Sequence, residues 1–194
     1  QGVAVQWSSA DTAVAVVSTT GTVTSRKVGA TYVMARTATL RDSVLFTMTQ
    51  VVALVSVSPA TRLFNALQDT ARLSATPRDR RGTLVPGRAV HWSSSDTSVA
   101  VVDSTGLARA IGNGTAAIRA TVDTATGSAS VTVSQSVAGI DVKADTATLL
   151  QVGATRSFTV TAIDGRGNLV SGTALSFTWS SNNTSVLTVN PTSG

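Results

Sequence analysis

The chain has no cysteine and no glutamate, and its one histidine is His91. Without cysteine, neither a disulfide nor a thiolate metal site can hold the fold, so its stability must come from packing and backbone hydrogen bonds. No run of 18 or more apolar residues occurs, so no membrane insertion is predicted. The sequence opens with Gln-Gly-Val-Ala-Val instead of Met and shows no signal-peptide pattern. We therefore expect a piece of a longer protein or a processed product.

Aromatic residues make up only 4% of the 194 residues, whereas hydrophobic residues make up 42%. The apolar residues are mostly Val and Ala, and Ser and Thr together number 55. β-Branched and small residues of this kind suit pleated strands better than helices. The composition therefore predicts an all-β protein.

Arginine dominates the positive charge, with 13 Arg and 2 Lys against 10 Asp, for a net charge of +5. Such a balance permits binding to acidic polymers or surfaces. The cations are spread along the chain, and only Arg78, Arg80, Arg81 and Arg88 approach a cluster. A nucleic-acid binder would show a denser basic stripe with interleaved aromatics, so we predict no nucleic-acid partner.

One segment occurs three times, as QWSSADTAVAVVSTTG, HWSSSDTSVAVVDSTG and TWSSNNTSVLTVNPTSG. Its tryptophans, Trp7, Trp92 and Trp179, are separated by 85 and 87 residues. A second segment agrees with this register, because DRRGTLVPG at 79–87 matches DGRGNLVSG at 164–172. A period of about 85 residues is one small domain long, so the chain is predicted to be a tandem array.

One complete unit extends over residues 51–135, preceded by the C-terminal part of a repeat at 1–50 and followed by the N-terminal two-thirds of another at 136–194. About seven short strands are predicted in the complete unit, bounded by Gly, Pro, Asp, Asn or Ser. They cover 54–57, 71–75, 89–92, 99–102, 107–111, 115–122 and 128–133. No segment has a sustained helical period, so each unit is predicted to be a two-sheet sandwich.

The three tryptophans are predicted to pack in the sandwich cores. Asp11, Asp96 and Asn183 each follow a tryptophan by four residues, and Asp79 and Asp164 share a second repeated position. Asp and Asn at such places commonly accept hydrogen bonds from their own backbone two residues on. Oxygen ligands for calcium are the alternative, but one loop rarely supplies six oxygens and the chain has no Glu. The sequence therefore predicts structural turns, with no metal site and no cofactor.

The serines beside Trp92 raise the question of a catalytic serine. A serine nucleophile needs a base within hydrogen-bond reach, and the only histidine, His91, is adjacent to Trp92 in a predicted strand, so the two side chains face opposite ways. The residues equivalent to His91 are Gln6 and Thr178, so two of the three units lack the base. No catalytic residue is predicted, and the chain is expected not to be an enzyme.

Residues 90–133, VHWSSSDTSVAVVDSTGLARAIGNGTAAIRATVDTATGSASVTV, resemble the group 2 bacterial immunoglobulin-like domains. The shared features are a Trp-Ser-Ser strand, an Asp-x-x-Gly turn, a Gly-Thr-Ala-x-Ile strand and a closing Val-Thr-Val strand. The first unit lacks the glycine before its last strand, and the third has Asn183 in place of Asp and an inserted Pro191. The family occurs as tandem repeats in intimin-like and invasin-like surface proteins and in some phage structural proteins. The resemblance implies an extracellular or cell-surface location, with the virion as the alternative.

Two functions follow as expectations. The first is a structural segment, a stalk or filament block whose partners are flanking repeats or other copies, possibly joined head to tail when an incomplete unit accepts a strand from the next copy. The second is a recognition module, an adhesin that binds a carbohydrate, a host surface or an anionic surface through the loop with Arg78, Arg80, Arg81 and Arg88. This basic loop is not repeated, since Arg78, Arg80 and Arg88 correspond to Ile163, Gly165 and Thr173.

Overall fold

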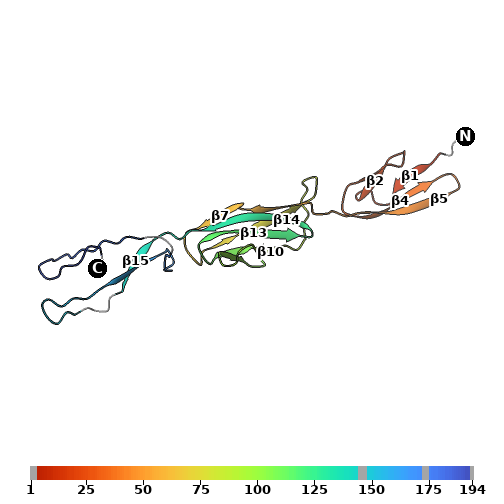
Figure 1. The fold of residues 1–194 in the computed structure, drawn as a ribbon. Helices are drawn as coiled ribbons and strands as arrows, with labels where there is room; N and C mark the ends of the chain where they lie inside the picture. The colour runs from red at the N-terminus through yellow and green to blue at the C-terminus, as the bar shows by residue number, and fades with distance from the viewer. Residues whose placement is uncertain (1–3, 144–147, 172–174, 193–194) are drawn as a thin grey trace. The chain divides into compact units, whose positions relative to one another are not determined.

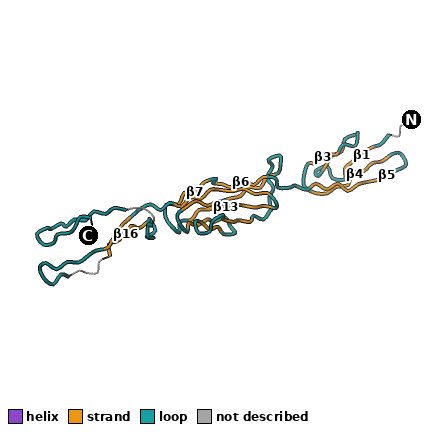
Figure 2. The backbone as a smooth tube through the Cα atoms, in the orientation of Figure 1, coloured by secondary structure: helices purple, strands orange, loops and turns teal. Residues whose placement is uncertain are grey.

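The computed structural model describes residues 4–143, 148–171 and 175–192. Within these ranges every regular element is a strand and none is a helix, which confirms the predicted all-β fold (Figures 1 and 2). The described residues include no helix that could cross a membrane. The chain divides into two compact units, the first formed by residues 1–53 and 78–87 and the second by residues 54–77 and 88–194.

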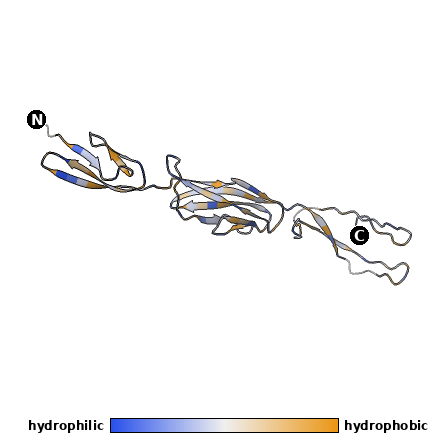
Figure 3. Cartoon of the chain, turned by 180° about the vertical axis from the view of Figure 1, so that it is seen from behind, coloured by the Kyte–Doolittle hydropathy of each residue, from blue (hydrophilic) through white to orange (hydrophobic). Residues whose placement is uncertain are grey.

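Unit 1 contains two small antiparallel sheets. Strands β1 (Gln6–Ser9), β4 (Gly29–Arg36) and β5 (Arg41–Met48) form the first, in the order β1-β4-β5. Strands β2 (Ala15–Val17) and β3 (Val23–Ser25) form the second. Figure 3 shows hydrophobic and hydrophilic stretches on the strands of this unit, the pattern of a sheet that buries one face.

Unit 2 contains the complete sandwich. Its four-stranded sheet has the order β10-β13-β14-β7, with β10 (His91–Ser94), β13 (Gly114–Val122), β14 (Ala125–Val133) and β7 (Thr61–Phe64). The facing strands are β11 (Ala100–Val102), β12 (Leu107–Ala110) and β8 (Thr70–Arg72) in one sheet, and β6 (Leu54–Ser58) and β9 (Ser74–Arg78) in another. Beyond the sandwich, β15 (Gly139–Lys143) pairs with β16 (Thr159–Ile163).

The core of the sandwich consists of the inward side chains of these strands. Along β13, alternate residues are buried, and Ile118 and Val122 are completely inaccessible. β14 contributes Val131, and β7 contributes Phe64, which is 1% exposed. This alternation with a period of two is what the sequence pattern of 115–122 predicted.

The middle repeat has nine strands, β6 to β14, so the prediction of about seven is wrong in two places. The predicted strand 71–75 is two strands, because β8 pairs with β12 while β9 pairs with β6, and the chain changes sheet at Leu73. β7 was not predicted, since its four residues show no alternation and are held by parallel pairing with β14, far away in the sequence.

The tryptophans lie at the edge of the core, and their predicted core position needs correction. Trp7 is 37% exposed, and Trp92 and Trp179 are half-buried. The reason is topological: β1 and β10 are edge strands of their sheets, so each indole covers a turn glycine at the margin of the sandwich. A Cβ atom placed on Gly106 would lie 3.0 Å from the ring of Trp92, and one on Gly21 would lie 3.0 Å from that of Trp7.

Candidate functional site

The most heavily hydrogen-bonded carboxylate in the described part of unit 2 is that of Asp164, in the loop after β16. A bridge between Ile163 and Leu169 closes this loop, and Gly167, with φ of 79°, makes its turn. Asp164 Oδ1 accepts the backbone N–H groups of Arg166 at 2.9 Å and Asn168 at 3.0 Å. The side chain, only 2% exposed, therefore organises its own loop.

The other carboxylate oxygen of Asp164 joins the loop to the end of the middle repeat. Its Oδ2 accepts the backbone N–H of Leu67 at 2.9 Å and the side-chain amide of Gln135 at 3.0 Å. The same Gln135 amide nitrogen donates to the carbonyl of Leu169 at 3.0 Å. Gln135 is itself held by Asn113, whose amide nitrogen donates to the Gln135 side-chain oxygen at 3.0 Å. We call Asp164, Gln135 and Leu67 the latch.

Two further contacts surround the latch. The Asn168 side chain donates to the carbonyl of Leu67 at 3.1 Å, and Arg166 Nε lies 2.6 Å from Asp69 Oδ1 in an ion pair. Both partners of this ion pair are partly exposed, so it adds less than a buried pair would. The loop of 164–170 thus contacts the middle repeat through three side chains of different chemistry.

Burial by itself would raise the pKa of Asp164. The hydrogen bonds that the carboxylate accepts, first from the Gln135 side chain and then from three backbone N–H groups, outweigh burial and hold the pKa well below its ordinary value of 3.8. The carboxylate is therefore ionised at neutral pH, and every bond around it is charge-assisted.

Asp79 repeats this arrangement within unit 1, 85 residues earlier. Its Oδ1 accepts the backbone N–H groups of Arg81 and Thr83, each at 2.9 Å. Its Oδ2 accepts the side-chain amide of Gln50 at 2.9 Å, and Gln50 also donates to the carbonyl of Leu84 at 3.2 Å. The Gln50 bond is the main reason why the pKa of Asp79 is lowered. Gln50 precedes Gln135 by the same 85 residues, a signal in the sequence that the motif analysis missed.

The predicted recognition loop is only partly brought together. Arg80 and Arg81 line a hollow in unit 1 with Arg26 and Lys27. Arg78 turns back, and its guanidinium donates to the carbonyl of Gly82 at 2.7 Å. Arg88 belongs to unit 2, where its Nε lies 3.8 Å from Asp123 Oδ2. Arg26 and Lys27 were absent from the predicted set because they come from a distant part of the sequence.

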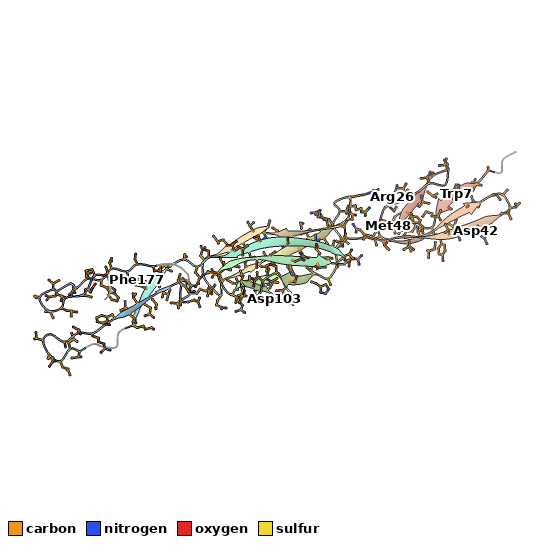
Figure 4. All side chains as sticks on the ribbon, viewed as in Figure 1. Trp7, Arg26, Asp42, Met48, Asp103 and Phe177 are labelled. Atoms are coloured by element: carbon orange, nitrogen blue, oxygen red, sulfur yellow. The ribbon has the colours of Figure 1, made fainter. Side chains whose placement is uncertain are left out.

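The repeated Asp and Asn residues after each tryptophan form the predicted turns. The N–H groups of Ala13, Ser98 and Ser185 donate to the side-chain oxygens of Asp11, Asp96 and Asn183, at 2.8, 2.9 and 3.2 Å. Asp103, labelled in Figure 4, acts in the same way and accepts the N–H of Thr105 at 2.8 Å. In the described ranges, no three His, Cys, Asp or Glu side chains come close enough to hold a metal ion.

The serines beside Trp92 take part in local hydrogen bonds. Ser94 Oγ donates to the carbonyl of Asp96 at 3.0 Å, and Ser95 Oγ accepts the N–H of Ala117 at 2.9 Å. His91 is exposed and paired with Thr121 in the strand register. These contacts fix the end of β10.

Comparison with known proteins gives one match to a protein family. The model of the bacterial Ig-like domain (group 2) matches residues 51–133. Ice-binding protein 1 of Shewanella frigidimarina (strain NCIMB 400) is 32% identical over 189 residues, which cover 94% of this chain and 20% of that protein. The chain thus spans about a fifth of the length of this relative.

Solved structures with similar folds come from surface proteins. Domains 1–6 of the surface layer protein SbsC are 21% identical, with a TM-score of 0.43, and the match covers 90% of this chain and 25% of that one. The C-terminal fragment of intimin, in complex with the intimin-binding domain of its translocated receptor, is 15% identical with a TM-score of 0.42. That match covers 67% of this chain and 51% of the fragment.

Proposed function

Because residues 51–133 are a group 2 bacterial immunoglobulin-like domain, we propose that the chain is a non-catalytic structural segment of an extracellular or cell-surface protein, in which tandem repeats act as a stalk or filament block. The observation that carries this proposal is the latch. A stalk must resist bending where one repeat meets the next. A loop of the following repeat held by Gln135 and Leu67 of the middle repeat is a device for that purpose.

The physical argument concerns the number and type of bonds that must break before the loop can move. Asp164 is buried and charged, so leaving its position would cost the bonds from Gln135 and Leu67 at once. A hydrogen bond to a charged group contributes about 1.5–3 kcal/mol, more than an ordinary one. The repetition of the same Asp and Gln pair within unit 1 supports a role that belongs to the array and not to one domain.

The test measures a distance distribution between β14 and β16. The chain has no cysteine, so Ser128→Cys and Thr159→Cys, at two exposed positions, can be spin-labelled without background. We expect a narrow distribution that Gln135→Ala broadens, because the variant removes both donors from the loop. Gln6→Ala, which removes a side-chain amide that accepts from Arg36 in unit 1, is the matched control and should leave the distribution unchanged. An equally narrow distribution in Gln135→Ala would contradict the proposal.

A second candidate is a recognition module, favoured by the hollow with Arg26, Lys27, Arg80 and Arg81 in unit 1. Four cations around one hollow provide a site for a carbohydrate with acidic groups, a host surface or another anionic surface. Replacing Arg80 and Arg81 by Ser should abolish binding to acidic glycans if this function holds. The relative named for ice binding adds a further measurement, since ice affinity of this chain alone would contradict a purely structural role.

Two variants of the structural function differ in what surrounds the chain. In one, copies assemble head to tail by strand complementation, and in the other the repeats belong to a phage tail or capsid decoration protein. Electron microscopy of the native material separates them, since regular filaments with one chain per repeat support head-to-tail assembly, whereas isolated rods contradict it.

A further inference from the structure

We propose that the hollow of unit 1 is a seat for one particular kind of segment: a neighbouring immunoglobulin-like half-repeat with the sequence pattern of residues 54–69, ending in an acidic residue that pairs with Arg81. This inference deepens the strand-complementation form of the proposed function and rests on it. It follows from comparing unit 1 with the middle repeat, position by position, at the 85-residue period.

In the middle repeat the segment has a defined position. β7 pairs in parallel with β14, from Thr61 opposite Ser130 to Phe64 opposite Val133. Beyond β7, the carbonyls of Phe64 and Asn65 accept the N–H groups of Ser134 and Ser136, both at 2.9 Å.

The end of the segment is also fixed. Ala110 and the segment exchange two bonds, since Gln68 N donates to Ala110 O at 3.0 Å and Ala110 N donates to Asp69 O at 2.9 Å. The Asp69 carboxylate then pairs with Arg166.

The hollow in unit 1 is lined by the counterparts of these partners. Subtracting the period converts Ala110, Ser134, Ser136, Asp164, Arg166 and Asn168 into Ser25, Thr49, Val51, Asp79, Arg81 and Thr83, and all six line the hollow. Arg26 and Met48, which also line it, are labelled in Figure 4. The groups that hold residues 64–69 in the middle repeat are thus already assembled in unit 1.

The apolar face beside the hollow is also uncovered. Ala129 of β14 is 2% exposed, whereas its counterpart Val44 of β5 is 62% exposed. In the middle repeat this face packs under β6, where Val55 is 3% exposed, and its backbone approaches Gly127 closely. Among the described strands of unit 1, β5 pairs only with β4, so its other edge can accept a strand as β14 accepts β7.

Charge selects the segment over other extended peptides. Arg81 corresponds to Arg166, whose Nε lies 2.6 Å from Asp69, and Arg26 and Lys27 add positive charge on the same hollow. Asp79 contributes one negative charge there, already engaged with Gln50. An acid at the position of Asp69 therefore complements the seat, whereas a neutral or basic residue does not.

The experiment titrates the full chain into a fluorescein-labelled synthetic peptide of residues 53–70 and follows anisotropy. We expect saturable one-to-one binding, together with slower hydrogen exchange at the amides of β5. A peptide with Asp69→Asn should bind about tenfold more weakly, the scale of one charge-assisted hydrogen bond. A scrambled peptide is the control for non-specific attraction to a basic chain.

A double-mutant cycle tests the pairing itself. Arg81→Ala in the chain should weaken the native peptide about tenfold and abolish the difference between the native and Asp69→Asn peptides. Arg80→Ala is the matched control, since its counterpart Gly165 has no side chain to pair, and it should change binding by less than about twofold.

Three results would overturn the proposal: no saturable binding, binding without protection of β5, or equal losses from Arg80→Ala and Arg81→Ala. A sulfated oligosaccharide that binds the hollow when the peptide does not would assign it to the recognition function instead. The latch is measured separately, between β14 and β16 of unit 2, so the seat and the structural function can fail independently.

Discussion

At the scale of residues, the notable pair is a carboxylate and an amide. An aspartate that starts a turn is ordinary, and Asp96 and Asp103 of the middle repeat do no more than hold their own loops. Asp164 does this with one oxygen and contacts the preceding repeat with the other. A glutamine is suited to that second oxygen because its amide donates two hydrogens and can reach both Asp164 and Leu169.

The lowered pKa of Asp164 makes the latch sensitive to acid and not to moderate changes near neutrality. A carboxylate whose pKa is lower in the folded state stabilises that state fully above the unfolded pKa, and the contribution is lost as pH falls through the folded pKa. We expect protection of the Leu67 amide from hydrogen exchange to be constant from pH 7 to 5 and to begin falling below about pH 4.

The control for this prediction is Asp164→Asn, which has no proton to gain at this position. It should show lower Leu67 protection that does not respond to this pH change, apart from the intrinsic exchange rate. Asp103→Asn removes a carboxylate elsewhere in the middle repeat and should leave the wild-type pH profile of Leu67 in place. A wild-type profile that stays flat to pH 2 would show that the carboxylate does not hold this amide.

At the scale of elements, two turns with nearly the same backbone differ in what surrounds them. Gly106 has φ of 81° and ends the turn between β11 and β12, whereas Gly82 has φ of 80° in the loop of unit 1. A Cβ atom on Gly106 would lie 2.5 Å from the Leu73 carbonyl and 3.0 Å from Trp92. A Cβ atom on Gly82 would meet nothing within 4 Å.

Alanine substitutions at these glycines separate backbone strain from crowding. Gly82→Ala should cost about 1–2 kcal/mol, the strain of a left-handed conformation with a side chain. Gly106→Ala should cost about 1–3 kcal/mol more, because the methyl group has no room beside Leu73 and Trp92. Urea unfolding of the two variants against wild type gives both values, and equal costs would contradict the packing of Trp92 over the turn.

At the scale of the whole molecule, the two units differ in how well their cores are closed. Ile118 of β13 is fully buried under both sheets of unit 2, and its counterpart Val33 of β4 is 2% exposed in unit 1. Yet unit 1 leaves Val44, Leu45 and Tyr32 more than half exposed. The free energy from burying apolar area is therefore smaller per residue in unit 1.

We expect two unfolding transitions, with unit 1 unfolding first. Ile118→Ala should destabilise the later transition by about 2–5 kcal/mol and leave the earlier one in place. Val33→Ala should shift only the earlier transition. Tyr32, the single tyrosine, reports on unit 1 in near-ultraviolet difference spectra. A single transition shifted by both substitutions would show that the units unfold together.

Repetition in the sequence determined the strand class and the period, because the same turn glycines and apolar alternation recur about every 85 residues. It also led to the Asp turns, since such contacts are local and reach only two residues along the chain. The boundaries at 50 and 135 remain predictions. Residues 78–87, predicted to lie in the middle repeat, cluster with unit 1.

Only the tertiary structure decided which of these residues meet. Nothing local in the sequence shows that β7 lies beside β14, or that Asp164 receives the N–H of Leu67 from 97 positions away. The tryptophans lie at the core margin because β1 and β10 are edge strands, a property of sheet order. Local patterns depend on side-chain period and turn chemistry, whereas the latch and the seat depend on pairings between distant segments, which only the folded chain brings within hydrogen-bond reach.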